Sequence, residues 1–456
     1  MTFSIYNTQS RGLQLVSVTG RPVHIYCCGP TVYRDAHVGN LRTFLLADLI
    51  TRTLKLSGQE VVLVQNITDV GHMSEDFEEQ DKLLSQAKLE KTDPFEIARK
   101  YEEKFHTDLA RLNISPANKY PRASETIPGM LSIIEKLIAN GSAYVAESGS
   151  VYFSAQTCST YGAISGNKLD ALKPGHRYEY SGDGEKKFHA DWALWKSAGN
   201  RTEMVWQSPW GLGFPGWHIE CTAMSLDLLK EHVDIHVGGI DLRFPHHENE
   251  RAQSNAIIGK EAVDLWVHGE HLLFEGRKMS KSANNVVLVS DLIEQGLDPL
   301  SLRLALLENR YRSQMDLTWD SLRAANATLV RWRRAMATWG DSPAKVVDSE
   351  IQNALNEDLD TPRALLRLRA IEKDQKLSPE EKRAIFNFAD DVLALDLHRQ
   401  IEVKPISDEQ AELLEKREIA RAEKNWSESD RLRDLLAAQG ISVNDNPDGQ
   451  SWNWII

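Results

Sequence analysis

The chain has 456 residues, of which 41% are hydrophobic and 26% are charged, a composition typical of a globular protein with roughly three domains. Its first residues lack the apolar stretch of a secretory signal and no run approaches transmembrane length, so we expect a cytoplasmic protein without a membrane partner. The four cysteines do not make a disulfide framework. The net charge of −13 argues weakly against binding of nucleic acid over a broad basic surface, although it does not exclude a local basic stripe.

The first elements in the chain are a strand, a glycine turn and a helix. Residues 23–26 read as a buried strand, a glycine–proline pair ends it, and an apolar pattern of helical period runs through residues 41–56. Such a turn directs backbone N–H groups and the positive end of a helix dipole to one point, which suits a phosphate. The turn also holds a thiol, Cys28, and an imidazole, His37. A buried cysteine and a capping residue would explain both from this stretch alone.

Residues 60–64 read as a second strand, so the first three elements form a βαβ unit and predict a parallel sheet. Thr68 follows the carboxyl end of this strand, where ligands bind in such sheets. Helical patterns then predict helices over residues 94–112 and 127–140. Between residues 141 and 200, short strand signals amid glycine, serine and lysine predict an irregular lobe inserted into the sheet.

The sheet is predicted to continue after this lobe. Residues 233–237 read as a strand that ends in Gly238 and Gly239 and is followed by Asp241. Residues 264–268 predict one more strand.

From about Ser290 onward the chain is predicted to turn helical and to stay so. Capping signals mark helix starts after Ser378 and Ser407, and each is completed by a Glu or Gln three residues on. Residues 341–343 and 403–405 are plausible joints.

Four separated residues could bind a metal ion. His246 and Glu250 are four residues apart, so one face of a helix presents both. Together with Cys28 and Cys221 they offer two thiolates, an imidazole and a carboxylate, which make a tetrahedral Zn²⁺ set. His247 leaves an alternative open because it is three residues from Glu250. From spacing alone, buried cysteines and a surface His/Glu pair would explain the same residues.

Two short motifs could bind phosphate. His37 can donate a hydrogen bond to a phosphate oxygen, and Gly39 allows a ligand to approach the start of the helix that Asn40 opens. A later loop of Lys-Met-Ser-Lys-Ser supplies the ammonium groups of Lys278 and Lys281. Each motif alone is typical of an ordinary turn, but the two motifs together, in this order along the chain, are a far more specific sign of phosphate binding.

These motifs resemble those of class I aminoacyl-tRNA synthetases, and specifically of cysteinyl-tRNA synthetases. Residues 37–40 resemble the HIGH motif, with Asn40 in place of its second histidine, and residues 278–282 are the KMSKS motif as written. The stretches that match the cysteinyl pattern are residues 28–33, 216–221, 244–250 and 356–365, and residues 426–452 resemble its small C-terminal domain. Residues 70–73 depart from the pattern, because many relatives carry acidic residues and a lysine there.

The resemblance implies an enzyme that activates L-cysteine with ATP to cysteinyl-adenylate and transfers it to the 3′ end of tRNA(Cys). It implies one Zn²⁺ per chain, which would bind the substrate thiolate and thereby exclude serine, and Mg²⁺ that accompanies ATP. The implied zinc ligands are Cys28, Cys221, His246 and Glu250. We expect the enzyme to act as a monomer.

The resemblance also assigns residues to the reaction. The residues expected to act in catalysis are His37, Asn40, Lys278 and Lys281. Those expected to bind ATP are His37, Gly39, Asn40, Gly238, Gly239, Asp241 and Lys281, and those expected to line the cysteine pocket are Thr68, Trp217 and Asp241. The basic and aromatic candidates for tRNA contact are Arg331, Trp332, Arg333, Arg334, Arg421, Lys424, Trp426, Arg431, Arg433 and Trp452, although each could lie on a solvated helix face.

Two other functions stay open at this point. A ligase that joins cysteine to an amino sugar in low-molecular-weight thiol biosynthesis shares the zinc and nucleotide motifs but generally lacks the C-terminal tRNA domain, which this chain keeps over residues 407–456. The other is a non-catalytic paralogue that binds zinc or tRNA, and the intact His37, Lys278 and Lys281 argue against it.

The predicted fold class is α/β: a Rossmann-like doubly wound parallel sheet with an inserted connective lobe, followed by an α-helical bundle and a small C-terminal domain. The predicted domains are residues 1–120 and 201–268 for the two halves of the Rossmann catalytic domain, 121–200 for the connective lobe, 269–320 for the KMSKS loop and stem-contact region, 321–402 for the helical bundle and tRNA-binding domain, and 403–456 for the anticodon-recognition domain.

Overall fold

A four-stranded parallel sheet lies at the centre of the catalytic half, with its strands in the order β11–β10–β3–β4. Its strands are β3 (Val23–Cys27), β4 (Val61–Gln65), β10 (Val233–Gly239) and β11 (Val263–Gly269). Helix α1 (Val38–Leu56) connects β3 to β4, and the chain later returns on the other side of β3 at β10. The predicted doubly wound sheet is confirmed, and its switch point lies between β3 and β10, where such sheets bind ligands.

This computed structural model describes residues 2–71, 81–172, 184–230, 232–279, 285–400, 406–446 and 449–454. Lys281, His72 and Met73 and the predicted joint at residues 403–405 lie outside the described residues. Among the residues described, no helix combines the length and apolar character that crossing a membrane requires.

The two faces of the sheet belong to two hydrophobic cores, because successive side chains of a strand point to opposite sides. Ile25 of β3 packs with the core that contains α1 and α3 (Pro94–Arg111), whereas Tyr26 packs with α4 (Ile127–Ala139), α5 (Trp217–Leu228) and α6 (His246–Ile258). The sheet is therefore covered on both faces, which suits strands that carry apolar residues on both sides, as β4 does. The remaining elements of the N-terminal region are β1 (Ser4–Asn7), β2 (Gly12–Leu15) and α2 (Lys82–Glu90).

The inserted lobe is a five-stranded antiparallel sheet instead of the irregular segment that its composition predicted. Its strands, in spatial order, are β5 (Ala143–Val145), β6 (Val151–Phe153), β7 (Trp192–Ser197), β9 (Gly211–Pro215) and β8 (Trp206–Ser208). Most of these strands are too short to show an alternating pattern. The sheet also runs to Pro215, beyond the boundary predicted at residue 200.

A bundle of helices follows the catalytic sheet. Its helices are α7 (Val289–Glu294), α8 (Leu300–Leu307), α9 (Trp319–Thr338), α10 (Ser349–Asn356), α11 (Thr361–Lys373) and α12 (Pro379–Leu393). A small sheet of β12 (Leu272–Phe274), β13 (Arg277–Lys278) and β14 (Met315–Leu317) joins this bundle to the cleft region. The prediction that the chain stays helical after Ser290 is therefore wrong at β14, a strand too short to give a pattern.

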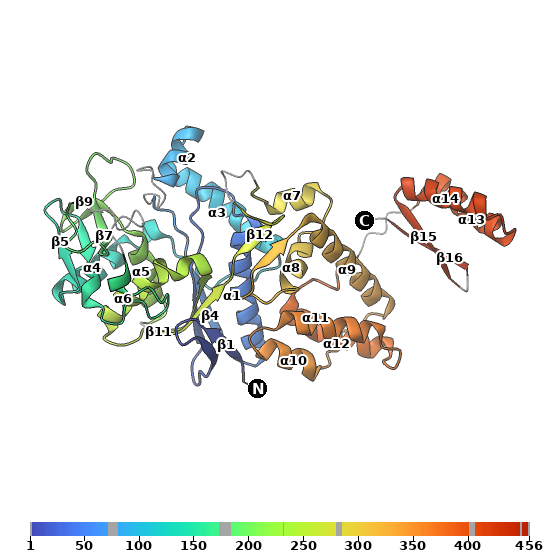
Figure 1. Ribbon diagram of the computed structural model, residues 1–456, viewed down its shortest axis with the longest axis horizontal. Coiled ribbons are helices and arrows are strands. Elements are labelled where there is room, and N and C mark those ends of the chain that lie inside the picture. Colours follow the sequence, from blue (N-terminus) through green and yellow to red (C-terminus); the bar gives the residue numbers. More distant parts are fainter. Residues whose placement is uncertain are drawn as a thin grey trace.

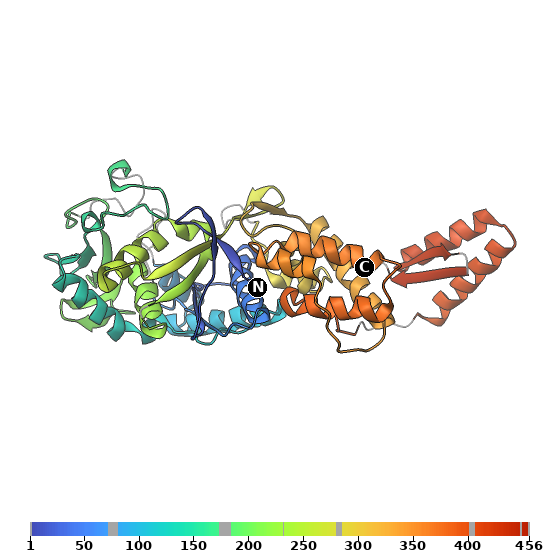
Figure 2. The ribbon, with the colours of Figure 1, turned by 90° about the horizontal axis from the view of Figure 1, so that it is seen from below.

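A small C-terminal unit stands apart from the bundle in Figure 1. It contains α13 (Asp408–Ala422), α14 (Trp426–Ala438) and a hairpin of β15 (Ile441–Asn446) and β16 (Gly449–Trp454). The hairpin is a second exception to the predicted helical run. In both ribbon views the inserted lobe, the parallel sheet, the bundle and this unit follow one another along the longest axis (Figures 1 and 2). The predicted capping boxes at Ser378 and Ser407 are confirmed.

Arg42 fixes helix α1 in place near its N-terminal end. Its guanidinium is buried and donates hydrogen bonds to the main-chain carbonyls of Glu270, His271, Arg310 and Ser313, at distances of 2.8–3.1 Å. These carbonyls flank β12 and β14. A polar side chain in α1 thus connects the start of this helix to the small sheet that carries Lys278.

Candidate metal centre and adjoining cleft

A cleft of about 380 Å³ opens where β3 and β10 end. Its wall includes the loop after β3, the N-terminus of α1, the turn after β10 and the end of β13. Of the residues predicted to form the site, those that line this cleft are Cys28, His37, Gly39, Asn40, Trp217, Gly239, Asp241 and Lys278. The topology therefore brings together most of the predicted residues that lie in the described part of the chain.

Helix α1 begins at Val38, two residues before the predicted start at Asn40. His37 is the N-cap, and its Nδ1 accepts a hydrogen bond from the backbone N–H of Asn40 at 3.2 Å. The Asn40 side chain accepts in return from the backbone N–H of His37, also at 3.2 Å. Asn40 thus completes a capping box at the third helical position instead of opening the helix, because only the pair of side chains satisfies both N–H groups.

The His37 imidazole is neutral in this setting. Burial lowers its pKa to about 4, with a further contribution from the positive charge of Arg34. Since Nδ1 accepts a hydrogen bond, the ring proton is on Nε2. The ring therefore presents a donor at the start of a helix, where an anion is also favoured by the helix dipole.

The two phosphate motifs meet at Gly39. A Cβ atom placed on Gly39 would lie 2.8 Å from Cε of Met279 and 3.0 Å from Nδ1 of His37. No larger residue would fit without displacing one of them. Met279 belongs to the Lys-Met-Ser-Lys-Ser loop, and the neighbouring Lys278 is exposed and lines the cleft.

The four predicted metal ligands lie together at the base of this cleft, and we call them the two-thiolate set: Cys28, Cys221, His246 and Glu250. The two sulfurs are 3.9 Å apart, Oε1 of Glu250 is 3.6 Å from Sγ of Cys28, and Nε2 of His246 is 2.9 Å from the same oxygen. Tetrahedral Zn²⁺ with ligands at about 2.0–2.3 Å separates neighbouring donors by roughly 3.3–3.8 Å. The donor set therefore fits this ion in number and type, and its separations of 2.9–3.9 Å bracket the expected range.

Glu250 supplies an independent sign that a cation belongs there. Its carboxylate is buried, and Oε2 has no hydrogen-bond partner. Burial raises the pKa of Glu250 well above its ordinary value, so the ionised form is costly without a positive charge nearby. A divalent ion would remove this cost.

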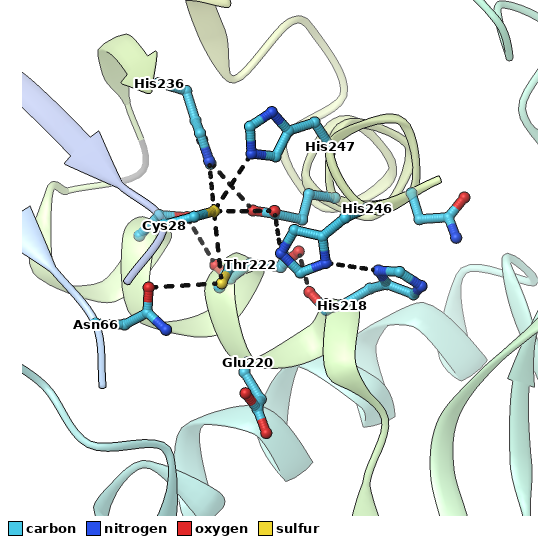
Figure 3. Close-up of polar contacts among 12 residues, drawn as sticks. Cys28, Asn66, His218, Glu220, Thr222, His236, His246 and His247 are labelled. Atoms are coloured by element: carbon cyan, nitrogen blue, oxygen red, sulfur yellow. Dashed lines mark hydrogen bonds and ion pairs between the residues drawn. The ribbon is translucent and has the colours of Figure 1, made fainter. Parts of the chain in front are cut away.

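Sequence reasoning missed three of the histidines that surround this centre. Nε2 of His236 lies 3.4 Å from Sγ of Cys28, and the His218 ring contacts the His246 ring at 2.9 Å (Figure 3). Nε2 of His268 contacts Nδ1 of His247 at 2.8 Å. His236 lies in β10 two residues after another buried polar residue, Asp234, so its polarity alone does not mark it as part of the site. His247, left open as an alternative ligand, also reaches Cys28, with its Nε2 at 3.3 Å.

Trp217 connects the metal centre to the cleft. Its ring stacks on that of His246, with 4.1 Å between centroids and 26° between planes. Since Trp217 lines the cleft and His246 belongs to the two-thiolate set, a small molecule in the cleft would contact the tryptophan beside the metal ligands.

Thr68, predicted to line the cysteine pocket, and Gly238, predicted to bind ATP, do not line the cleft. Thr68 is only 2% exposed, accepts a hydrogen bond from Asn66 at 3.1 Å and donates one to Glu220 at 3.4 Å. A Cβ atom placed on Gly238 would lie 2.4 Å from the His247 ring, so this glycine makes room for a histidine.

Two candidates for tRNA contact are wrong. Trp332 is fully buried in the helical bundle, where its ring packs edge-on against Phe386. Arg333 is buried as well and forms an ion pair with Asp298 at 2.6 Å. Both belong to the apolar face of α9, which the basic residues around them concealed in the sequence.

The candidates in the C-terminal unit are accessible. Trp426 is 55% exposed at the start of α14, and the Arg421 guanidinium lies 5.5 Å from its ring centroid. Arg431 and Arg433 form surface ion pairs with acidic residues one turn away on α14. Arg331, in the bundle, pairs with Glu372.

Two protein-family models match the chain. Residues 14–327 match a model described as the class I (C) tRNA synthetase catalytic domain, and residues 404–452 match the cysteinyl-tRNA ligase anticodon binding domain. The chain is 42% identical over 458 residues to the cysteine–tRNA ligase of Thermus thermophilus, with 94% of each chain covered. It is 38% identical over 482 residues to that of Chlorobium chlorochromatii, with 99% of each covered.

Solved structures share the fold at low sequence identity. Mycobacterium tuberculosis methionyl-tRNA synthetase in complex with methionyl-adenylate superimposes with a TM-score of 0.55 at 14% identity, covering 82% of this chain and 90% of that one. The Agrobacterium radiobacter LeuRS in a ternary complex with tRNA gives 0.60 at 9% identity, covering 83% and 84%. These likenesses support the Rossmann-like sheet with its following helical bundle.

Proposed function

The chain belongs to the cysteine–tRNA ligase family of class I aminoacyl-tRNA synthetases, and from that premise we propose that it activates L-cysteine with ATP and joins it to the 3′ end of tRNA(Cys). The observation that carries the proposal is the buried two-thiolate set at the base of a cleft that begins at a helix N-terminus. Cysteine needs a soft metal for recognition, and its activation needs a phosphate site.

The two-thiolate set holds one Zn²⁺. When bound, this ion supplies a preference for thiolate over hydroxyl, which separates cysteine from serine where an apolar pocket could not. Trp217 covers His246 on the cleft side, and Asp241 lies where it can pair with the α-amino group of the amino acid. Thr68 takes part through the polar network of Asn66, whose Oδ1 accepts from the backbone of Gly29 at 2.8 Å.

The N-terminus of α1 binds the phosphates of ATP. His37 donates from Nε2, Asn40 holds the His37 ring through the capping box, and Gly39 leaves room for the ligand. Lys278 and Lys281 neutralise the charge that develops on the phosphates, together with Mg²⁺ that accompanies ATP. Gly238, Gly239 and Asp241 lie beside the adenosine.

The reaction has two steps. A carboxylate oxygen of cysteine attacks the α-phosphorus of ATP, the bond to the β-phosphate breaks, and pyrophosphate leaves cysteinyl-adenylate behind. A hydroxyl of the terminal tRNA ribose then attacks the adenylate carbonyl and AMP leaves. No side chain acts as nucleophile, so the protein contributes positioning and electrostatic stabilisation.

The C-terminal unit recognises the anticodon. Basic and aromatic side chains suit phosphates and splayed bases, and Trp426 with Arg421 offers both on an exposed surface. We assign residues 403–456 to this task and residues 321–402 to further tRNA contact. The enzyme acts as a monomer in the cytoplasm.

The match of residues 404–452 to an anticodon-binding domain favours tRNA over an amino sugar as the acceptor. Incubation of the purified chain with ATP, radiolabelled cysteine and either acceptor tests this directly, because pyrophosphate release alone would not separate the two. We expect label in tRNA(Cys), none in the amino sugar, and no charging with serine. Label in the amino sugar alone would refute the proposal, as would a metal-free chain that still charges tRNA and excludes serine.

A further inference from the structure

A second set of metal-binding atoms lies beside the first. Four side chains each place one possible ligand atom within 4.8 Å of the others, and we call them the two-histidine set: Cys28, His236, His247 and Glu250. None of the four side chains is more than 4% exposed. The set therefore has the number, chemistry and burial of a complete tetrahedral site.

Its spacing also matches a bound ion. The Cys28 sulfur lies 3.4 Å from Nε2 of His236 and 3.3 Å from Nε2 of His247, and Oε2 of Glu250 lies 3.6 Å from Nε2 of His236. Roughly 3.3–3.6 Å is the separation of neighbouring sulfur, nitrogen and oxygen donors around tetrahedral Zn²⁺. Figure 3 shows His236 and His247 together on one side of the Cys28 sulfur, with His246 and His218 on another.

Glu250 faces both sets with different oxygens. Oε1 lies 2.9 Å from Nε2 of His246, in the two-thiolate set, whereas Oε2 lies nearest His236 and has no hydrogen-bond partner. A buried carboxylate oxygen without a partner is costly, and a cation is the kind of group that would satisfy it. The two-thiolate set uses Oε1 of Glu250, so Oε2 is left for the two-histidine set.

The outer hydrogen bonds of His247 orient it as a ligand. Its Nδ1 bonds to Nε2 of His268 at 2.8 Å, and Nδ1 of His268 bonds to the hydroxyl of Thr8 at 2.8 Å. Metal-binding histidines characteristically use one ring nitrogen for such a partner and the other for the ion. These hydrogen bonds leave Nε2 of His247 directed at Sγ of Cys28.

We propose that the two-histidine set is a second metal-binding position, which accepts the ion when the two-thiolate set is incomplete. The two positions share Cys28 and Glu250, so one ion occupies one position at a time. Cys28 and Glu250 alone match the charge of a divalent ion, whereas the two-thiolate set carries one further negative charge from Cys221. The proposal rests on the proposed function for the identity of the ion, Zn²⁺, with Co²⁺ as its spectroscopic substitute.

The test uses the full-length Cys221→Ser variant, which removes a ligand that only the two-thiolate set contains. We expect it to bind one Zn²⁺ or Co²⁺ per chain, measured by metal analysis after equilibrium dialysis. X-ray absorption should find one sulfur and two imidazoles, and the sulfur-to-Co²⁺ charge-transfer absorption should fall to about half of that of the wild type with its two thiolates. Replacing His236 and His247 by Leu in the same background should abolish binding.

Two outcomes would overturn the proposal: a folded Cys221→Ser chain that stays metal-free, or binding that survives the loss of both histidines. If Cys221→Ser does not fold, His246→Ala provides the same test, because His246 also belongs only to the two-thiolate set. Two imidazoles and one sulfur around its ion would support the second position, and two sulfurs without imidazole would refute it. Measurements on the wild-type chain separate this inference from the proposed function. A wild-type chain that binds no metal would refute the proposed function. If the wild-type chain binds its ion through two sulfurs but both variants are metal-free, only the second position is refuted.

Discussion

The carboxylate of Asp48 in α1 lies 2.6 Å from the guanidinium of Arg303 in α8, and both side chains are fully buried. Arg303 also donates hydrogen bonds to the main-chain carbonyls of Leu112 and Leu393, at 3.0 and 2.6 Å. The helix whose N-terminus forms the cleft is therefore joined by one buried ion pair to the helical bundle. The position of His37 depends on this connection as well as on the sheet.

The Asp48→Asn variant should be strongly destabilised, because it leaves the Arg303 charge buried without a counter-ion. We expect the free energy of unfolding to fall by about 3–5 kcal/mol, measured by urea denaturation. Asp320 and Arg323 form a matched exposed pair, with 95% and 53% of their side chains accessible. Asp320→Asn should change the same quantity by less than about 1 kcal/mol. Equal effects from the two substitutions would contradict the importance of the buried pair.

The same pair predicts how stability depends on pH. Burial opposes ionisation of Asp48, but the charges of Arg303 and Arg52 outweigh it and hold the pKa of Asp48 below its ordinary value. A carboxylate with a lowered pKa stabilises the folded state above its unfolded pKa, about 3.9, and this contribution is lost as the pH falls through the folded pKa. The stability difference between wild type and Asp48→Asn should therefore be largest above pH 5 and shrink below pH 4. A constant difference across this range would refute the assignment.

The charge state of His37 can be tested by histidine-selective NMR titration. Removing the positive charge in Arg34→Ala should raise the pKa of His37 from about 4 toward its ordinary value near 6.5. Removing the negative charge in Asp241→Asn should act in the opposite direction, because that charge favours the imidazolium. Shifts of the same sign in both variants would show that neither charge acts on this ring.

The sequence predicts the catalytic sheet because its buried strands β3, β4, β10 and β11 are rich in β-branched and aromatic residues. The lobe between them could not be predicted in this way. Its strands are three to six residues long, and β6 pairs with β5 and with β7 over only three residues each. The pairing of β6 with β7 also joins segments about 40 residues apart in the chain. Likewise, Met315–Leu317 forms a strand only because β12 is beside it.

The residues of the candidate site also differ in how far the sequence predicts them. Residues in compact motifs, such as His37 and Cys28, could be identified from local spacing and from the resemblance. His236 and His268 could not, because they reach the centre from separate strands and no local motif surrounds them. Asn40 does not open helix α1 as predicted, since His37 takes the N-cap position through a ring nitrogen, which local preferences do not favour.

Trp217 should affect cysteine binding more than metal binding. Its ring stacks on His246 from the cleft side, so Trp217→Ala should raise the KM for cysteine in ATP–pyrophosphate exchange while one zinc per chain remains. The Trp217→Phe variant keeps an aromatic ring and serves as the control, with a smaller rise in KM. Loss of zinc from Trp217→Ala would instead assign the ring to support of the metal ligands.

A Trp426 variant tests the role of the C-terminal unit, because it should affect the charging of tRNA but not the activation of cysteine. The ring is 55% exposed and lies in a unit distant from the cleft, so Trp426→Ala should leave cysteine-dependent ATP–pyrophosphate exchange unchanged. Stacking of a base on an aromatic side chain contributes about 1–3 kcal/mol, so the KM for tRNA(Cys) should rise by roughly 5- to 150-fold. Leu15, which is 59% exposed in β2 and lies outside the regions assigned to tRNA contact, gives the control, and Leu15→Ala should alter neither measurement. A Trp426→Ala enzyme that charges tRNA normally would remove this surface from tRNA recognition, and parallel loss of both activities would indicate a structural role.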